Sequence, residues 1–355
     1  MIVIKCVFSQ NTDIISLDTT LTDTEISFQD SINILNKHNN MLIASRNAYN
    51  DGLVFFENSD VKQAINSFTN AIRIDSTFSD AYFYRAQCYK SINIELAISD
   101  YNTAYRLDSL DFTPLYFLAM MYSDRNLAVK IYEFIISKDP KQSKAYYEKG
   151  IILYLNGNIN DAILFFTESI ILNNDARSFN DRGSCYRKLE KYELAIEDYL
   201  TAINLNPNLA FIYNNLASTY RKQGNSENAL NYYSNAINKD ASYAVAFNNR
   251  GSLYIELNDF DNAKKDIDQA ILLDNNYAPA YNNMGVILHQ EKRYNDALDA
   301  FDKAILLNNN YAKAFLNRGI TRQMNRDEDG ACSDWDKAKE LGINIANKYL
   351  INDCN

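Results

Sequence analysis

A block of about 34 residues recurs along most of this 355-residue chain, and this period limits the possible folds more than any other feature. Four consecutive copies of a short motif begin at Tyr213, Phe247, Tyr281 and Phe315, each 34 residues after the last. An alanine follows twelve residues after the small residue that ends each motif, and another comes seven residues later. A chain of like blocks stacks them side by side, so we expect an array that presents an extended surface.

The apolar residues within one block have helical spacing rather than the alternation of a strand. In the block that begins at Ala210, two apolar stripes are separated by a break at Gln223–Asn225. The first stripe is Tyr213, Leu216, Ala217 and Tyr220, and the second is Ala229, Tyr232, Tyr233 and Ala236. This pattern predicts a helix, a turn and an antiparallel helix. Small residues at the eighth and twentieth places let the two backbones approach, because overpacking there would cost roughly 1–3 kcal/mol.

Nine such blocks can be counted, and we number them repeats 1 to 9, with places counted from the first residue of each. They begin at Ser45, Ser79, Phe112, Ser143, Ala176, Ala210, Ala244, Ala278 and Ala312. In repeat 3, Tyr122 precedes Ala128 by six residues where nine is usual, which predicts a tight turn between its helices.

The predicted organisation has four parts. They are a signal-like segment at 1–10, an extension with a capping helix at 11–44, nine repeats at 45–342 and a capping helix at 343–355.

These blocks resemble the tetratricopeptide repeat. Its pattern is a large residue at place 4, Leu at 7, Gly or Ala at 8, Tyr at 11, Ala at 20, an aromatic residue at 24, Ala at 27 and Pro at 32. Repeat 6 matches all but the last, whereas Arg182, Arg250 and Arg318 depart from the pattern at place 7. The resemblance implies an all-α, right-handed superhelical solenoid of about nine helix-turn-helix repeats. Such arrays are scaffolds for very different partners, so the fold does not name a role.

The two ends carry further resemblances. The segment from Gly330 to Gly342, with Ala346 and Cys354, resembles the closing segment of many Bacteroidetes tetratricopeptide proteins. That resemblance implies a bond between Cys332 and Cys354 in an oxidising compartment and free thiols in a reducing one. Residues 1–10 resemble the end of a secretory signal without its positive start. Two compartments stay open: export, slightly favoured, if the true start lies upstream, and the cytoplasm otherwise.

Composition and motifs argue against several classes of function. A net charge of −10 disfavours nucleic acid or an anionic membrane as the main partner. No apolar run approaches the roughly 20 residues that span a bilayer. The two histidines, His38 and His289, are far apart, and no glycine-rich phosphate loop occurs. We therefore expect a protein that is not an enzyme and has no cofactor or metal. Cys88 and Cys185 are expected to be small core residues.

The resemblance also implies that places 2, 5, 6, 9, 12 and 13 of each first helix line a concave groove. With these places facing inward, the predicted groove has an aromatic, apolar wall in repeats 2–4, a row of carboxamides in repeats 6–9 and positive charge between them. The wall is Phe83, Tyr84, Tyr116, Phe117, Met120, Tyr147, Ile151, Tyr154 and Leu155. The carboxamide row is Asn214, Asn215, Asn248, Asn249, Asn282, Asn283 and Asn317. The positive residues are Arg177, Arg187, Lys188, Arg221 and Lys222.

The predicted function is non-catalytic binding of a protein or peptide, with an acidic segment as one possible feature of the partner. Each Asn carboxamide has a donor and an acceptor for the amides of an extended peptide, and the apolar wall would anchor its side chains. Other interpretations stay open. The Asn residues are common at place 6 of this family and abundant in this chain, the aromatic residues could pack between repeats, and Lys or Arg at place 13 is often only a solvated helix end. The chain could also be a structural component, or a subunit whose catalytic partner is another polypeptide.

Overall fold

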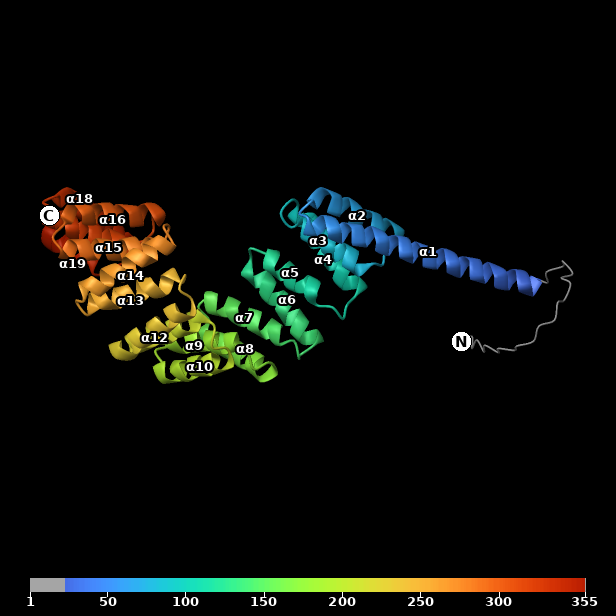
Figure 1. The fold of residues 1–355 in the computed structure, drawn as a ribbon, viewed down its shortest axis with the longest axis horizontal. Helices are drawn as coiled ribbons and strands as arrows, with labels where there is room; N and C mark the ends of the chain where they lie inside the picture. Colours follow the sequence, from blue (N-terminus) through green and yellow to red (C-terminus); the bar gives the residue numbers. More distant parts are fainter. Residues whose placement is uncertain (1–22, 355) are drawn as a thin grey trace. The chain divides into compact units, whose positions relative to one another are not determined.

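The computed structural model describes residues 23–354, with side chains from residue 27 onwards. The predicted signal-like segment at 1–10 lies outside the described residues, as does the extension up to residue 22. Residues 23–354 form 19 α-helices and no strand (Figure 1). The prediction of an all-α repeat fold is therefore confirmed.

The chain divides into two compact parts, which meet between Ile131 and Tyr132 and are described separately. The helices of the N-terminal part are α1 (Asp23–Glu57), α2 (Val61–Ile74), α3 (Ser79–Tyr89), α4 (Ile94–Leu107) and α5 (Thr113–Met121). Helix α6 (Arg125–Lys138) crosses the division. Each of repeats 1 and 2 is an antiparallel helix pair, with α1 packed on α2 and α3 on α4.

The C-terminal part contains six further repeats and a final short helix. Its helices are α7 (Ser143–Leu155), α8 (Ile159–Leu172), α9 (Ala176–Lys188), α10 (Tyr192–Leu205), α11 (Ala210–Lys222), α12 (Ser226–Lys239), α13 (Ala244–Glu256), α14 (Phe260–Leu273), α15 (Ala278–Gln290), α16 (Tyr294–Leu307), α17 (Ala312–Met324), α18 (Glu328–Glu340) and α19 (Ala346–Asp353). Each odd-numbered helix from α7 to α17 pairs with the helix after it, and each from α7 to α15 also contacts the next odd-numbered helix. The first helices of successive repeats therefore share one face.

The expected helix over 24–44 does not end before repeat 1. It is continuous with the first helix of that repeat, so that α1 has 35 residues. Its upstream half exposes apolar side chains, with Phe28 exposed by 68% and Leu35 by 58%. This half extends α1 rather than covering the apolar surface of repeat 1.

Repeat 3 is shortened in its first helix rather than in its turn. Helix α5 has 9 residues, whereas α7 has 13. The connections after these two helices, 122–124 and 156–158, have the same length. Pro114 near the start of α5 and an apolar run through Met121 give a helix that is buried on most of its length.

The small residue at place 8 allows the two helices of a repeat to touch, as the sequence predicts. A Cβ atom added to Gly285 would lie 2.6 Å from an atom of the Phe301 ring on the paired helix. Phe301 and the alanines at places 20 and 27 of the same repeat, Ala297 and Ala304, are fully or almost fully buried. The aromatic ring thus fills the space that the absent side chain leaves.

In seven of the nine repeats, the turn has the same backbone feature at place 15. There the chain adopts a positive φ, which is 84° at Gly224 and 60° at Lys292. Only Gly157 and Gly224 use glycine at this place, and five other repeats have a residue with a side chain: Ser59, Glu190, Asn258, Lys292 and Arg326. These five positions have a conformation that costs an L-residue about 1–2 kcal/mol relative to right-handed helix.

The arginines that depart from the repeat pattern at place 7 form buried ion pairs. Arg250 on α13 makes a two-pronged contact with Asp266 on α14, with Nε–Oδ2 and Nη2–Oδ1 distances of 2.7 and 2.8 Å. Its third nitrogen group donates to Ser234 of the preceding repeat at 2.9 Å. The same clasp recurs as Arg85–Asp100, Arg182–Asp198 and Arg318–Asp334. Arginine therefore replaces leucine at this place because a buried aspartate faces it.

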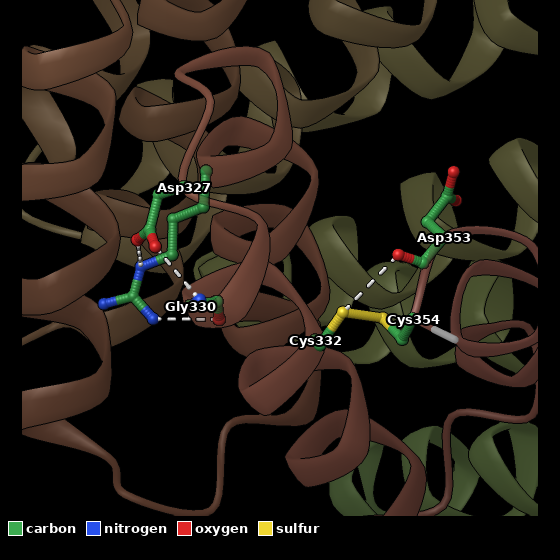
Figure 2. Close-up of a disulfide and its surroundings, with 6 residues drawn as sticks. Asp327, Gly330, Cys332, Asp353 and Cys354 are labelled. Carbon is green, nitrogen blue, oxygen red and sulfur yellow. Dashed lines mark hydrogen bonds and ion pairs between the residues drawn. A yellow bond between two sulfur atoms is a disulfide. The ribbon is translucent and has the colours of Figure 1, made fainter.

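The C-terminal end is closed by α19 and a disulfide. Cys332 on α18 is bonded to Cys354 after α19, with Cα atoms 5.7 Å apart (Figure 2). Beneath this link, Tyr349 stacks on the buried Trp335 ring with centroids 5.0 Å apart. Helix α19 lies within the predicted 343–355 segment and packs on α18 of the last repeat.

Candidate peptide-binding groove

A chain of hydrogen bonds joins the asparagines of successive repeats. In each case the carboxamide at place 6 donates to the carboxamide at place 5 of the repeat before, with N–O distances of 2.8–3.0 Å. The donor–acceptor pairs are Asn215–Asn180, Asn249–Asn214, Asn283–Asn248 and Asn317–Asn282. We call these residues the carboxamide ladder. It links repeats 5 to 9 along the face that their first helices share.

The ladder continues one repeat upstream through a carboxylate. Asn180 donates to Asp181 at 2.9 Å, and the Tyr147 hydroxyl donates to the other oxygen of Asp181 at 2.7 Å. Burial raises the pKa of Asp181, and the hydrogen bonds from Tyr147 and Asn180 oppose that rise. Tyr147 of repeat 4, assigned by sequence to the aromatic wall, therefore has its hydroxyl committed to this network.

The two places of the ladder differ in exposure. Asn214, Asn248 and Asn282 at place 5 are only 4–5% exposed, so little of their surface can meet a ligand. Asn249 and Asn283 at place 6 are partly exposed, and each accepts only a long hydrogen bond of 3.4 Å from the asparagine before it. Each place-6 carboxamide thus keeps one N–H and part of its acceptor capacity for another molecule.

The partly exposed asparagines at place 6 line a groove of about 630 Å³ in repeats 6–9. Its walls include Asn249 and Asn283, together with Tyr277 and Tyr311 from the ends of repeats 7 and 8. Burial raises the pKa of Tyr277 to about 12, with smaller contributions from Tyr311 and Tyr243. The sequence analysis did not include these tyrosines, because it assigned groove positions only to the first helix of each repeat. A tyrosine recurs with the 34-residue period of the repeats at Tyr243, Tyr277 and Tyr311, and this recurrence is visible in the sequence.

A second, smaller pocket of about 350 Å³ is lined by residues of repeats 4–6. It shares Ser218 and Lys222 with the larger groove, so the two are adjacent. Arg187 and Lys188 also line it, and the Lys188 ammonium lies 5.1 Å from the centre of the Tyr154 ring. The structure thus brings together three of the five positive residues singled out in the sequence.

Arg221, the corresponding residue one repeat later than Arg187, has a different environment. Its Nε donates to Glu256 at 2.9 Å, and its Nη2 donates to Ser252 at 2.9 Å. Arg221 lines the larger groove, but Glu256 neutralises its charge. Arg177 is an exposed residue in the first turn of α9 and lines neither cavity.

The predicted aromatic wall is divided between the two parts of the chain. In the N-terminal part, Tyr84 contacts the rings of Tyr49 and Phe68, and Phe117 lies between Phe83 and Tyr101. Tyr116 is only 6% exposed. These rings pack between helices, which is the alternative that the sequence left open. Met120 and Leu155 are the exposed members of the set, at 69% and 55%.

The remaining sequence predictions concern the cysteines, metal binding and membrane-spanning helices. Cys88 and Cys185 are buried free thiols, as expected for core residues, and burial raises their pKa values to about 11 and 12. Across residues 23–354, His, Cys, Asp and Glu side chains nowhere gather in threes that could hold a metal ion. None of the helices in this described range combines the length and apolarity needed to cross a membrane.

Paired antiparallel helices, small residues at their contacts and a 34-residue period define a helical-repeat protein. Family models agree: a model described as TPR repeat matches residues 183–224, and models described as tetratricopeptide repeat match 212–242, 244–277 and 278–311. Residues 183–242 and 244–311 are therefore tetratricopeptide repeats.

Comparisons with individual proteins support the fold. The chain is 32% identical over 81 residues to human tetratricopeptide repeat protein 13, a match that spans 22% of this chain and only 9% of that protein. Among solved structures, it is similar to the APC/C heterotetramer Cut9–Hcn1, with a TM-score of 0.59 and 16% identity over 87% of this chain and 76% of that one. It is also similar to Pseudomonas aeruginosa PilF, with a TM-score of 0.51 and 20% identity over 61% of this chain and 98% of that one. At these identities the structures support the fold alone.

Proposed function

We propose that this protein is a non-catalytic scaffold that binds an extended peptide segment of another protein in the groove of repeats 5–9. The observation that carries the proposal is the groove of about 630 Å³ whose wall combines carboxamides with tyrosine rings. Tetratricopeptide repeats commonly serve as protein-interaction scaffolds, so the fold is consistent with this role.

The groove offers two kinds of contact. The remaining N–H and oxygen of Asn249 and Asn283 can pair with a backbone amide whatever the side chain, because every peptide unit presents a donor and an acceptor. The rings of Tyr277 and Tyr311 supply larger, rigid contact surfaces, which usually contribute most of the affinity. The positive residues at the upstream end favour a partner with an acidic segment.

The scaffold also limits the entropy that is lost on binding. The carboxamide ladder fixes each exposed rung through a hydrogen bond to the preceding repeat. Donors and acceptors that are already held in place lose little freedom when a ligand arrives. A ladder of this kind supports a binding role even though it also holds the repeats together.

A peptide-display selection on the full chain tests the proposal. Selected peptides are measured against Tyr277→Ala and Asn283→Leu variants, and against Leu272→Ala, whose residue on α14 is 77% exposed and lines neither cavity. Circular dichroism establishes that each variant is folded. We expect at least a tenfold loss of affinity for the groove variants and no change for Leu272→Ala. Peptides that bind all three variants equally well would contradict the proposal.

A second candidate is a role in assembly, favoured by the exposed apolar residues of α1. Phe28, Ile34 and Leu35 are 58–69% exposed on the half of α1 upstream of repeat 1. If they form a contact between copies, Leu35→Glu should lower the molar mass seen in analytical ultracentrifugation at high concentration. A monomer at all concentrations in the unmodified protein would remove this candidate.

A further inference from the structure

We infer that the pocket formed by Arg187, Lys188 and Lys222 is an anion site that binds one oxyanionic group, a carboxylate or phosphoryl group, of the groove's ligand. This inference rests on the proposed function for the source of the anion, but the pocket itself can be tested without a peptide.

The pocket has more positive than negative side chains in its wall. Among the described residues, Arg187 and Lys222 make no ion pair or hydrogen bond through their side chains, and the Lys188 ammonium lies over the face of the Tyr154 ring. Glu190 is the single carboxylate in the pocket wall, so it offsets one of three positive charges. Like charges that line one pocket repel one another, and an anion between them offsets that repulsion.

The surroundings make this cluster unusual for the protein. The whole chain has a net charge of −10, and Arg182, Arg221, Arg250 and Arg318 of the C-terminal part are each paired with a carboxylate. Arg187 is partly buried, so its guanidinium is less hydrated than one on an open surface. A partly buried cation without a partner is expected where a ligand supplies the counter-charge.

The chemistry favours an oxygen anion over a halide or an aromatic ligand. Guanidinium presents parallel N–H groups that match the paired oxygens of carboxylate and phosphoryl groups, and the two ammonium groups add further donors. A residual charge of about two matches a phosphoryl dianion better than a single carboxylate. The pocket adjoins the groove at Ser218 and Lys222, which line both, so it lies within reach of a side chain of a peptide in the groove.

Arginine side-chain NMR on the full chain tests the site with inorganic phosphate, at an ionic strength held constant with sodium chloride. The Nε–Hε signal of Arg187, assigned from Arg187→Gln, should shift and saturate in the millimolar range. The signal of Arg221 should not, because Glu256 already occupies its donors. Lys222→Gln should weaken phosphate binding at least about threefold.

The outcomes separate the possibilities. Stronger binding of phosphate than of acetate identifies a phosphoryl group as the preferred ligand, and equal binding identifies a carboxylate. A linear, unsaturated shift, or equal shifts at Arg187 and Arg221, would overturn the inference. A saturable phosphate site in a protein for which no groove peptide can be selected would instead retain the site and refute the proposed function.

Discussion

The clasp between Arg250 and Asp266 gives the sharpest test of how the repeats hold together. Asp266 lies on α14 with its side chain only 7% exposed, and it accepts two hydrogen bonds from Arg250, whose side chain is 20% exposed. Replacing Asp266 with Ala leaves a poorly solvated guanidinium whose remaining protein partner is Ser234. Removing one member of a buried pair typically costs about 3–5 kcal/mol. Because Arg250 is partly exposed, we expect Asp266→Ala to lower the free energy of unfolding by about 3 kcal/mol, near the low end of this range.

The double variant separates charge burial from packing. Arg250→Leu restores the residue that the repeat pattern has at place 7, and combined with Asp266→Ala it removes both charges. Because replacing a buried pair by apolar residues is often neutral, the double variant should be more stable than either single variant. Lys264→Ala on the same helix is the matched control. Its partner Asp268 is exposed by 55%, so the loss should be below about 0.5 kcal/mol.

Urea unfolding followed by circular dichroism at 222 nm measures these changes. Amide hydrogen exchange in α13 and α14 shows whether they are local, which matters because repeat arrays can unfold in steps. A loss below about 1 kcal/mol for Asp266→Ala would refute the reasoning. A double variant no more stable than Asp266→Ala would refute it as well.

Three further predictions concern the turns, the cap and a histidine. Lys292→Gly should stabilise the protein by about 0.5–1 kcal/mol in urea unfolding, because Lys292 has a positive φ, whereas Gly224→Ala should destabilise it by a similar amount. Reducing the Cys332–Cys354 bond should lower the stability of the C-terminal cap by about 3 kcal/mol, read from the fluorescence of Trp335, the only tryptophan; an unchanged thermal midpoint would contradict this. Burial lowers the pKa of His289, so the folded state binds its proton less readily than the unfolded state. Stability should therefore fall as the pH drops through about 6.5 toward the lower folded value, and an NMR titration midpoint at or above 6.5 would contradict this.

The repeat and the packing of its two helices could be predicted from the sequence, but the contacts between repeats could not. Small residues at place 8 and alanines at places 20 and 27 predict a helical pair because their steric role lies within one block. The partner of Arg182, Arg250 and Arg318 could also have been found. An aspartate follows each of them 16 residues later, at Asp198, Asp266 and Asp334, and this joint recurrence is visible in the sequence.

The carboxamide ladder shows where prediction from one sequence stops. Places 5 and 6 both carry asparagine in repeats 6–8, and a helical wheel puts both near the inward face. Their different exposure depends on how far each first helix is rotated against the next, which is set by the packing of every interface in the stack. The same limit applies to α1. Its apolar residues predict burial against something, but the sequence does not specify whether that surface is repeat 1.

The ladder also changes what gives a ligand its affinity. Each partly exposed carboxamide already donates a hydrogen bond to the repeat before it. A peptide therefore adds hydrogen bonds to groups that already have a partner, not to groups that have none. A net hydrogen bond to such a group contributes only about 0.5–1.5 kcal/mol. The cations Arg187 and Lys222 have no comparable internal partners, since they make no ion pair within the described chain. Selectivity among peptides should therefore follow aromatic contacts and one anionic group. The carboxamides would fix the register along the groove.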